Sequence, residues 1–124
     1  MDWETIIKES KDVVLVENSI PRIRATLNLM NVVAVVTDEY ELENVLLNYK
    51  FNTIWLDYDL TRIFKPFHRQ TSLNVIKTYK RALQNAGCKL IVIHSWNPFG
   101  RKRLYNELRD LGIKIVIKRH WRIF

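Results

Sequence analysis

One stretch in the middle of the chain decides the fold: Thr53-Ile54-Trp55-Leu56 is apolar and leads directly into Asp57-Tyr58-Asp59-Leu60. A short apolar run rich in β-branched and aromatic residues is typical of a strand that is buried on both faces. Four further runs share this character, at residues 13–16, 32–36, 89–93 and 113–117. Most of them lack alternation between polar and apolar residues, which favours a parallel sheet covered on both sides.

Helical patterns separate the five runs. They are expected at residues 21–30, at 39–49 after Asp38 as the N-cap, at 72–86 before Gly87, and at 98–111 before Gly112. This alternation predicts an α/β fold with three layers and a five-stranded parallel sheet. The flavodoxin-like strand order 2-1-3-4-5 is the first choice.

Length and composition set the class of protein. The 124 residues are 48% hydrophobic and 27% charged, which suits one domain over residues 1–124, with 118–124 as a basic tail packed by Trp121 and Phe124. The single cysteine argues against a disulfide scaffold. The acidic N-terminus does not resemble a signal peptide, and no apolar run approaches the roughly 20 residues of a membrane helix. These features predict a soluble cytoplasmic protein without a membrane partner.

The formal net charge of +7 hides an uneven distribution. Residues 1–60 hold 5 Lys/Arg and 11 Asp/Glu, which gives −6, and residues 61–124 hold 15 Lys/Arg and 2 Asp/Glu, which gives +13. Such asymmetry suggests a surface that faces an anion, with nucleic acid as the commonest candidate. Basic residues on an ordinary solvated face are the alternative.

In an open α/β sheet, ligands bind beyond the carboxyl ends of the strands, where the strand order reverses. With the order 2-1-3-4-5, the first, third and fourth strands meet there. They are followed by Glu17-Asn18-Ser19-Ile20-Pro21-Arg22, by Asp57-Tyr58-Asp59, and by His94-Ser95-Trp96-Asn97-Pro98-Phe99-Gly100-Arg101. The sequence therefore predicts one polar pocket made from three strand ends.

The residue types at these ends suit proton transfer and phosphate binding. Asp57 and Asp59 could hold a divalent cation, act as acid and base, or simply form the turn. His94 at the mouth of the sheet is a candidate proton carrier. Ser95 and Asn97 could bind a substrate oxygen or form a turn. The helix start at Gly100 and Arg101 favours an anion, although solvated arginines are the alternative.

At these residues the sequence resembles the cyclic-phosphate processing receiver domain family. Trp55-Leu56-Asp57-Tyr58-Asp59-Leu60 is similar to that family's strand ending in Leu-Asp-His-Asp-Leu, and residues 94–101 closely match its His-Ser-x-Asn-Pro-x-Gly-Arg segment. The resemblance covers nearly the whole chain. It implies a receiver-like fold, processing of cyclic phosphates in RNA or nucleotide metabolism, and His94, Asp57 and Asp59 as the acid/base or metal-binding set.

The chain departs from the family pattern at three positions. Glu17-Asn18 replaces an acidic pair, Tyr58 replaces the middle histidine, and Thr61 replaces a glycine. The tentative ligands of Mg²⁺ or another divalent cation are then Glu17, Asp57 and Asp59. A weakened site that binds cyclic nucleotides without cleaving them is consistent with these changes.

The working hypothesis is a phosphoesterase that hydrolyses a cyclic phosphodiester of a nucleotide or an RNA end. His94 is the expected general acid or base, Asp57 and Asp59 position the water, and Arg101 and Arg22 stabilise the phosphoryl oxygens. The basic second half would guide the substrate inward.

Two alternatives remain open at the level of sequence. A phosphoacceptor receiver would use Asp57, Ser95 and Lys118, although Arg119 stands where a proline is usual. A non-catalytic nucleotide or nucleic-acid binder would use the basic and aromatic residues 118–122, and Trp96 could stack a base. The sequence leaves the oligomeric state open.

Overall fold

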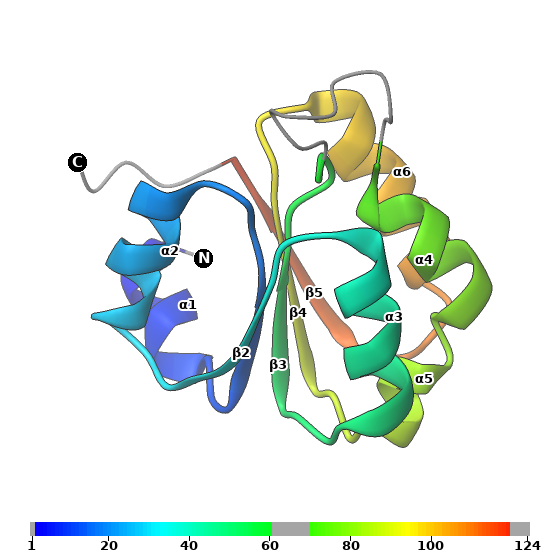
Figure 1. Cartoon of the computed structure of the whole chain (residues 1–124), viewed down its shortest axis with the longest axis horizontal. Helices are drawn as coiled ribbons and strands as arrows, with labels where there is room; N and C mark the ends of the chain where they lie inside the picture. The colour runs from blue at the N-terminus through cyan, green and yellow to red at the C-terminus, as the bar shows by residue number, and fades with distance from the viewer. Residues whose placement is uncertain (1, 61–69, 120–124) are drawn as a thin grey trace.

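The computed structural model describes residues 2–60 and 70–119, which form a five-stranded sheet between two layers of helices (Figure 1). The strand order is β2-β1-β3-β4-β5, and every neighbouring pair is parallel. This order confirms the prediction and brings the carboxyl ends of β1, β3 and β4 together at one edge. The strands are β1 (Val13–Val16), β2 (Val32–Val36), β3 (Thr53–Leu56), β4 (Leu90–His94) and β5 (Lys114–Lys118).

Six helices cover the two faces of the sheet in the described part of the chain (Figure 1). The helices α1 and α2 pack on one face, where they bury Leu15, Trp55 and Val92. The helices α3 to α6 pack on the other face, where the intervening strand residues lie in a second apolar cluster. The helices are α1 (Trp3–Glu9), α2 (Ile20–Leu27), α3 (Glu39–Asn48), α4 (Ser72–Tyr79), α5 (Ala82–Asn85) and α6 (Pro98–Leu108).

The N-terminal helix α1 was not anticipated from the sequence. Asp2 caps it by accepting a hydrogen bond from the Thr5 backbone N–H, and Ile6 is fully buried. Trp3 stacks on Trp55 of β3 with ring centroids 5.6 Å apart. The capping residue and the spacing of Trp3 and Ile6 are the local signal, but seven residues form a marginal helix by themselves. Packing against the sheet supplies the missing stability.

Helix boundaries differ in detail from the sequence prediction. The predicted helix 72–86 is two helices, α4 and α5, separated by Lys80 and Arg81. The predicted helices 21–30 and 98–111 end earlier, at Leu27 and Leu108. No described helix is long and apolar enough to cross a membrane.

The predicted C-terminal tail starts at least one residue later than expected. Lys118 is the last residue of β5 rather than the first residue of a tail. The predicted packing of Trp121 and Phe124 lies outside the described residues.

Candidate functional site

A pocket of about 250 Å³ lies at the carboxyl ends of β1, β3 and β4, the upper edge of the sheet in Figure 1. Residues from all three predicted strand ends contribute to it, so the expected convergence is present in the fold. The lining residues are Asn18, Arg22, Asp57, Asp59, Ser95, Trp96 and Asn97. Of the residues predicted to bind substrate, Arg22, Ser95 and Asn97 line the pocket, whereas Gly100 and Arg101 do not.

Three polar residues lie at one level of the sheet beneath this pocket. The register pairs Val16 with Leu56 and Leu56 with Ile93, so the residues that follow them are also neighbours. These are Glu17, Asp57 and His94, and only 1%, 4% and 2% of their surfaces are exposed. We call these three residues the inner row. By alternation they share the face of Trp55, the face that α1 and α2 cover.

The carboxylate of Glu17 is held by protein groups on both oxygens. Oε1 accepts a hydrogen bond of 2.7 Å from Nε of Arg22, which is also the ion pair of the two residues. Oε2 accepts hydrogen bonds from the backbone N–H groups of Asn18 and Ser19, at 3.0 and 3.2 Å. These contacts fix the orientation of the Glu17 side chain at the end of β1.

Asp57 is the carboxyl group of the inner row that also lines the pocket. Burial, followed by the negative charge of Glu17, raises its pKa from 3.8 to about 8, although the nearby Arg22 works in the opposite direction. Its side chain is hydrogen-bonded to that of Glu17. Ser72 at the start of α4 fixes the backbone by donating its hydroxyl to the Asp57 carbonyl at 2.6 Å. Near neutral pH, Asp57 therefore carries a proton that it can release or donate.

His94 is placed differently from the expectation. It is the last residue of β4, its ring lies 5.6 Å from that of Trp55, and it is not among the residues that line the pocket. Burial is the main cause that lowers its pKa from 6.5 to about 3, and Arg22 adds to this effect. The imidazole is therefore neutral at physiological pH. The catalytic role of His94 stays a prediction, and its position does not favour it.

A second set of residues surrounds the mouth of the pocket. We call Asn18, Asp59, Trp96 and Asn97 the rim. Trp96 is 43% exposed, and the guanidinium of Arg119, after β5, lies 5.7 Å from its ring centroid. Asn18 was not predicted as a site residue, and Arg119 was expected only as part of the basic and aromatic segment 118–122 of a nucleic-acid binder. Asn18 could have been found, since it follows a strand directly, but only the tertiary structure brings Arg119 to the rim.

The first backbone N–H groups of α6 are hydrogen-bonded to the residue that precedes the helix. The side chain of Asn97 accepts hydrogen bonds from the backbone N–H groups of Phe99 and Gly100, and its carbonyl accepts one from Arg101. The Arg101 side chain donates to the Ser95 carbonyl at 2.5 Å. These groups shape the loop, so the helix start expected to bind phosphate is engaged within the chain.

Gly100 has a packing role. A Cβ at this position would collide with Cβ and Cγ of Tyr58, the residue that replaces the family's middle histidine. The absence of a side chain at Gly100 thus lets α6 approach the loop after β3. This contact connects the two acidic residues of the β3 end with the loop that carries Ser95 and Asn97.

A divalent cation does not fit the predicted ligand set. Among the described residues, no group of three His, Cys, Asp or Glu side chains could hold a metal ion. Glu17 is ion-paired with Arg22, and the side chain of Asp57 is hydrogen-bonded to that of Glu17, so both carboxyl groups are engaged within the chain. The proposed ligands Glu17, Asp57 and Asp59 are not found as a metal-holding group.

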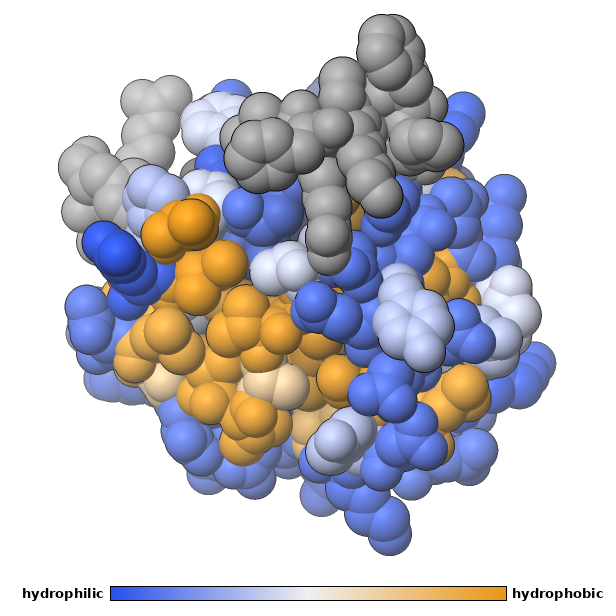
Figure 2. Space-filling model, in the orientation of Figure 1, coloured by the Kyte–Doolittle hydropathy of each residue, from blue (hydrophilic) through white to orange (hydrophobic). Residues whose placement is uncertain are grey.

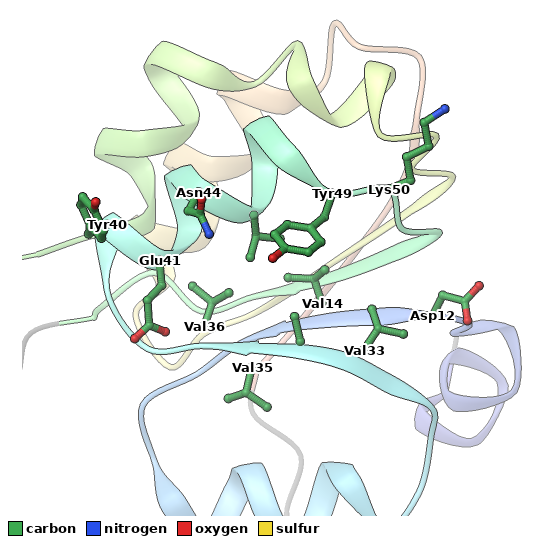
Figure 3. Close-up of a pocket in the computed structure, with 12 residues that line it drawn as sticks. Asp12, Val14, Val33, Val35, Val36, Tyr40, Glu41, Asn44, Tyr49 and Lys50 are labelled. Atoms are coloured by element: carbon green, nitrogen blue, oxygen red, sulfur yellow. The ribbon is translucent and has the colours of Figure 1, made fainter.

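A larger cavity of about 430 Å³ lies elsewhere, between the edge strand β2 and α3 (Figure 3). Valines form much of its lining, with Asp12 and Lys50 at one end and Glu41 at the other (Figure 3). Figure 2 shows apolar side chains gathered on the same side of the molecule, and the exposed ones on α2 and β2 include Ile20, Leu27 and Val33. The charged side chains of this cavity lie at its opposite ends, whereas the smaller pocket gathers polar groups at the carboxyl ends of three strands, so the smaller pocket is the candidate site.

Comparison with known proteins identifies the family of the chain. The model of the cyclic-phosphate processing receiver domain family matches residues 22–110, which is more than half of the chain. The chain belongs to this family. The matched range includes Asp57, Asp59 and the whole segment 94–101, whereas Glu17 and Asn18 precede it.

A solved structure of another protein has a similar fold. It is that of the RcsB response regulator of Salmonella typhimurium, described for its conformational dynamism in DNA interaction. The TM-score is 0.54 at 19% identity, and the match covers 87% of this receiver-family chain and 52% of RcsB. The chain thus spans about half the length of that neighbour, and the likeness shows the fold alone. No curated protein matches the sequence.

Proposed function

We propose that this receiver-family domain binds a cyclic phosphodiester of a nucleotide or RNA end in the strand-end pocket and opens its ring by hydrolysis. The observation that carries the proposal is Asp57: a buried carboxyl that lines a polar pocket, beside a guanidinium, with a pKa of about 8. A carboxyl group that keeps its proton near neutral pH is suited to general acid catalysis. The family's description supplies the substrate class.

The proposed step is attack of water on phosphorus. The new bond joins the water oxygen to phosphorus, and the bond from phosphorus to one ring oxygen breaks. Asp57 donates its proton to that leaving oxygen, and Asp59, on the same pocket, accepts the proton that water loses. Proton exchange with solvent then restores both groups. The guanidinium of Arg22 faces the phosphoryl oxygens, since it lines the pocket while its Nε holds Glu17.

The exposed rim supports a substrate that carries a base. Trp96 presents a partly exposed ring, and Arg119 lies over that ring. An aromatic face with a nearby cation is the combination on which single nucleotides stack. The proposed partners are therefore nucleotides or RNA ends, with the phosphate directed to Arg22 and the base to Trp96.

The test is turnover of 2′,3′-cyclic AMP by the wild-type chain and by matched variants. Asp57→Asn keeps the shape of the side chain but removes the proton donor, and it should lower kcat roughly 10²–10⁴-fold with binding retained. Asp12→Asn, in the cavity beside β2, is the control and should have no effect. His94→Gln should have a much smaller effect than Asp57→Asn. Unchanged turnover in Asp57→Asn would refute the assignment.

A phosphoacceptor function is the second candidate, since Asp57 and Ser95 line the same pocket and the fold is that of a response regulator. Its third residue, Lys118, ends β5 and pairs in register with His94 of the inner row. Incubation with acetyl phosphate and Mg²⁺, followed by intact mass measurement, separates the two functions. A stable phosphoryl adduct that is lost in Asp57→Asn would favour the phosphoacceptor.

A further inference from the structure

We infer that the guanidinium group of Arg22 stands in for a divalent cation, so that the site works without metal and becomes a metal site when Arg22 is removed. The inference rests on the proposed function only for what the cation would do to a substrate. The replacement itself concerns the folded chain and can be tested without any activity.

The first observation is the geometry around Glu17. Its buried carboxylate comes from the end of β1, where the family pattern has an acidic pair, and it receives the Nε of Arg22 at 2.7 Å. The other carboxylate oxygen accepts two backbone N–H groups. A cation entering here would have to displace Arg22 and would leave a partly buried guanidinium without its ion partner.

The second observation is the balance of charge. The positive charge of Arg22 offsets the negative charge of Glu17 in a direct ion pair, and Arg22 lines the same pocket as Asp57. A divalent cation that approached these carboxyl groups would therefore meet a positive charge already in place. The same balance explains how two carboxyl groups can lie side by side with 1% and 4% exposure.

The third observation is the position of Arg22 in the chain. It lies in the first turn of α2, five residues after Glu17, and α2 is packed against the sheet. A cation attached by so short a segment is present at a fixed place in every molecule, unlike an ion whose occupancy depends on its concentration. Arg22 also lines the pocket, so it can offer phosphoryl oxygens the positive charge that a metal would supply.

Thermal unfolding in EDTA, in MgCl₂ and in MnCl₂ tests the inference with four proteins. The wild-type midpoint should be the same in all three solutions. Arg22→Met should unfold at a lower temperature in EDTA, and millimolar Mg²⁺ or Mn²⁺ should raise its midpoint by about 5–10 °C. Glu17→Gln/Arg22→Met lacks the carboxylate and should not respond. Arg24→Met removes an exposed arginine of the same helix and should behave as the wild type.

Two outcomes would overturn the inference. One is a wild-type unfolding midpoint that rises in Mg²⁺ and falls back when EDTA is added. The other is a folded Arg22→Met protein whose unfolding midpoint is the same with and without Mg²⁺ or Mn²⁺. If Arg22→Met does not fold, the test is binding of Mn²⁺ to the wild-type chain, measured by the paramagnetic resonance signal of the ion. One bound Mn²⁺ per chain at millimolar concentration would refute the inference. Failure of cyclic-phosphate turnover would refute the proposed function and leave these metal results standing.

Discussion

The inner row and the rim of the strand-end pocket lie next to each other but differ in their exposure to solvent. Glu17, Asp57 and His94 are almost fully buried, and burial is the main cause that raises the pKa of Asp57 and lowers the pKa of His94. Asp59 and Trp96 of the rim are exposed to solvent. The difference teaches that substitutions in the inner row should act on stability, whereas under the proposed function those in the rim should act on contact with the ligand.

The largest expected effect is the pH dependence that the inner row gives to stability. Asp57 has a raised pKa, so between pH 3.8 and about 8 the folded chain keeps a proton that the unfolded chain has released, and the free energy of unfolding falls as pH rises. His94 has a lowered pKa, so between 6.5 and about 3 only the unfolded chain takes up a proton, and the free energy of unfolding falls as pH falls.

These two opposite slopes nearly cancel between pH 3.8 and 6.5. Above pH 6.5 only the Asp57 slope remains, and it should remove about 2 kcal/mol by pH 8. Urea unfolding across the pH range measures this profile. Asp57→Asn should abolish the alkaline fall and His94→Gln the acidic one. If both variants keep the wild-type profile, the inner row does not control stability in this way.

The next effect concerns the contact that holds the rim loop in place. Gly100→Ala should lower the free energy of unfolding by roughly 1–3 kcal/mol, because the new methyl group meets Tyr58 close to its backbone. Arg103→Ala, on the exposed side of the same helix, is the control. In a double-mutant cycle, Tyr58→Ala should cost less in the Gly100→Ala background than in the wild type. Additive costs would mean that the two residues are not coupled.

The smallest effect on stability is expected at the rim. Asp59→Asn should change the free energy of unfolding by no more than about 0.5 kcal/mol, because the side chain is exposed. It should nevertheless lower kcat for 2′,3′-cyclic AMP, since the proposed acceptor of the water's proton is lost. Chemical denaturation and turnover on the same sample measure both. A large loss of stability with unchanged turnover would contradict the different effects expected for substitutions in the rim and in the inner row.

Much of the fold could be predicted because its signals are local. The run Thr53-Ile54-Trp55-Leu56 and its four counterparts have no polar alternation, and only a sheet covered on both faces buries such runs. Asp38 was correctly identified as a cap: its side chain accepts from the Glu41 backbone N–H at 2.8 Å. The helix α1 was missed because its stability depends on packing against the sheet, where Trp3 stacks on Trp55, a residue fifty-two positions later in the sequence.

The sequence predicted the edge of the sheet at which the pocket lies, but not which of the polar side chains line it. Asp57 and His94 both follow or end apolar strands, so the sequence ranked them alike. In the fold, Asp57 reaches the pocket and His94 packs against Trp55 outside it. Gly100 was expected at a phosphate, but its neighbour Tyr58 lies forty-two positions earlier in the sequence. Such contacts depend on side-chain direction, which residue spacing does not contain.

The sequence by itself determined the α/β architecture, the order of the strands and the edge of the sheet at which polar residues gather. These follow from hydrophobic periodicity and from the handedness of parallel connections, which are properties of the chain and its backbone. Only the tertiary structure decided which carboxyl group holds a proton and that Arg22 neutralises Glu17. Desolvation and ion pairing depend on what surrounds a group in space, and that surrounding exists only once the strands and α2 have packed together.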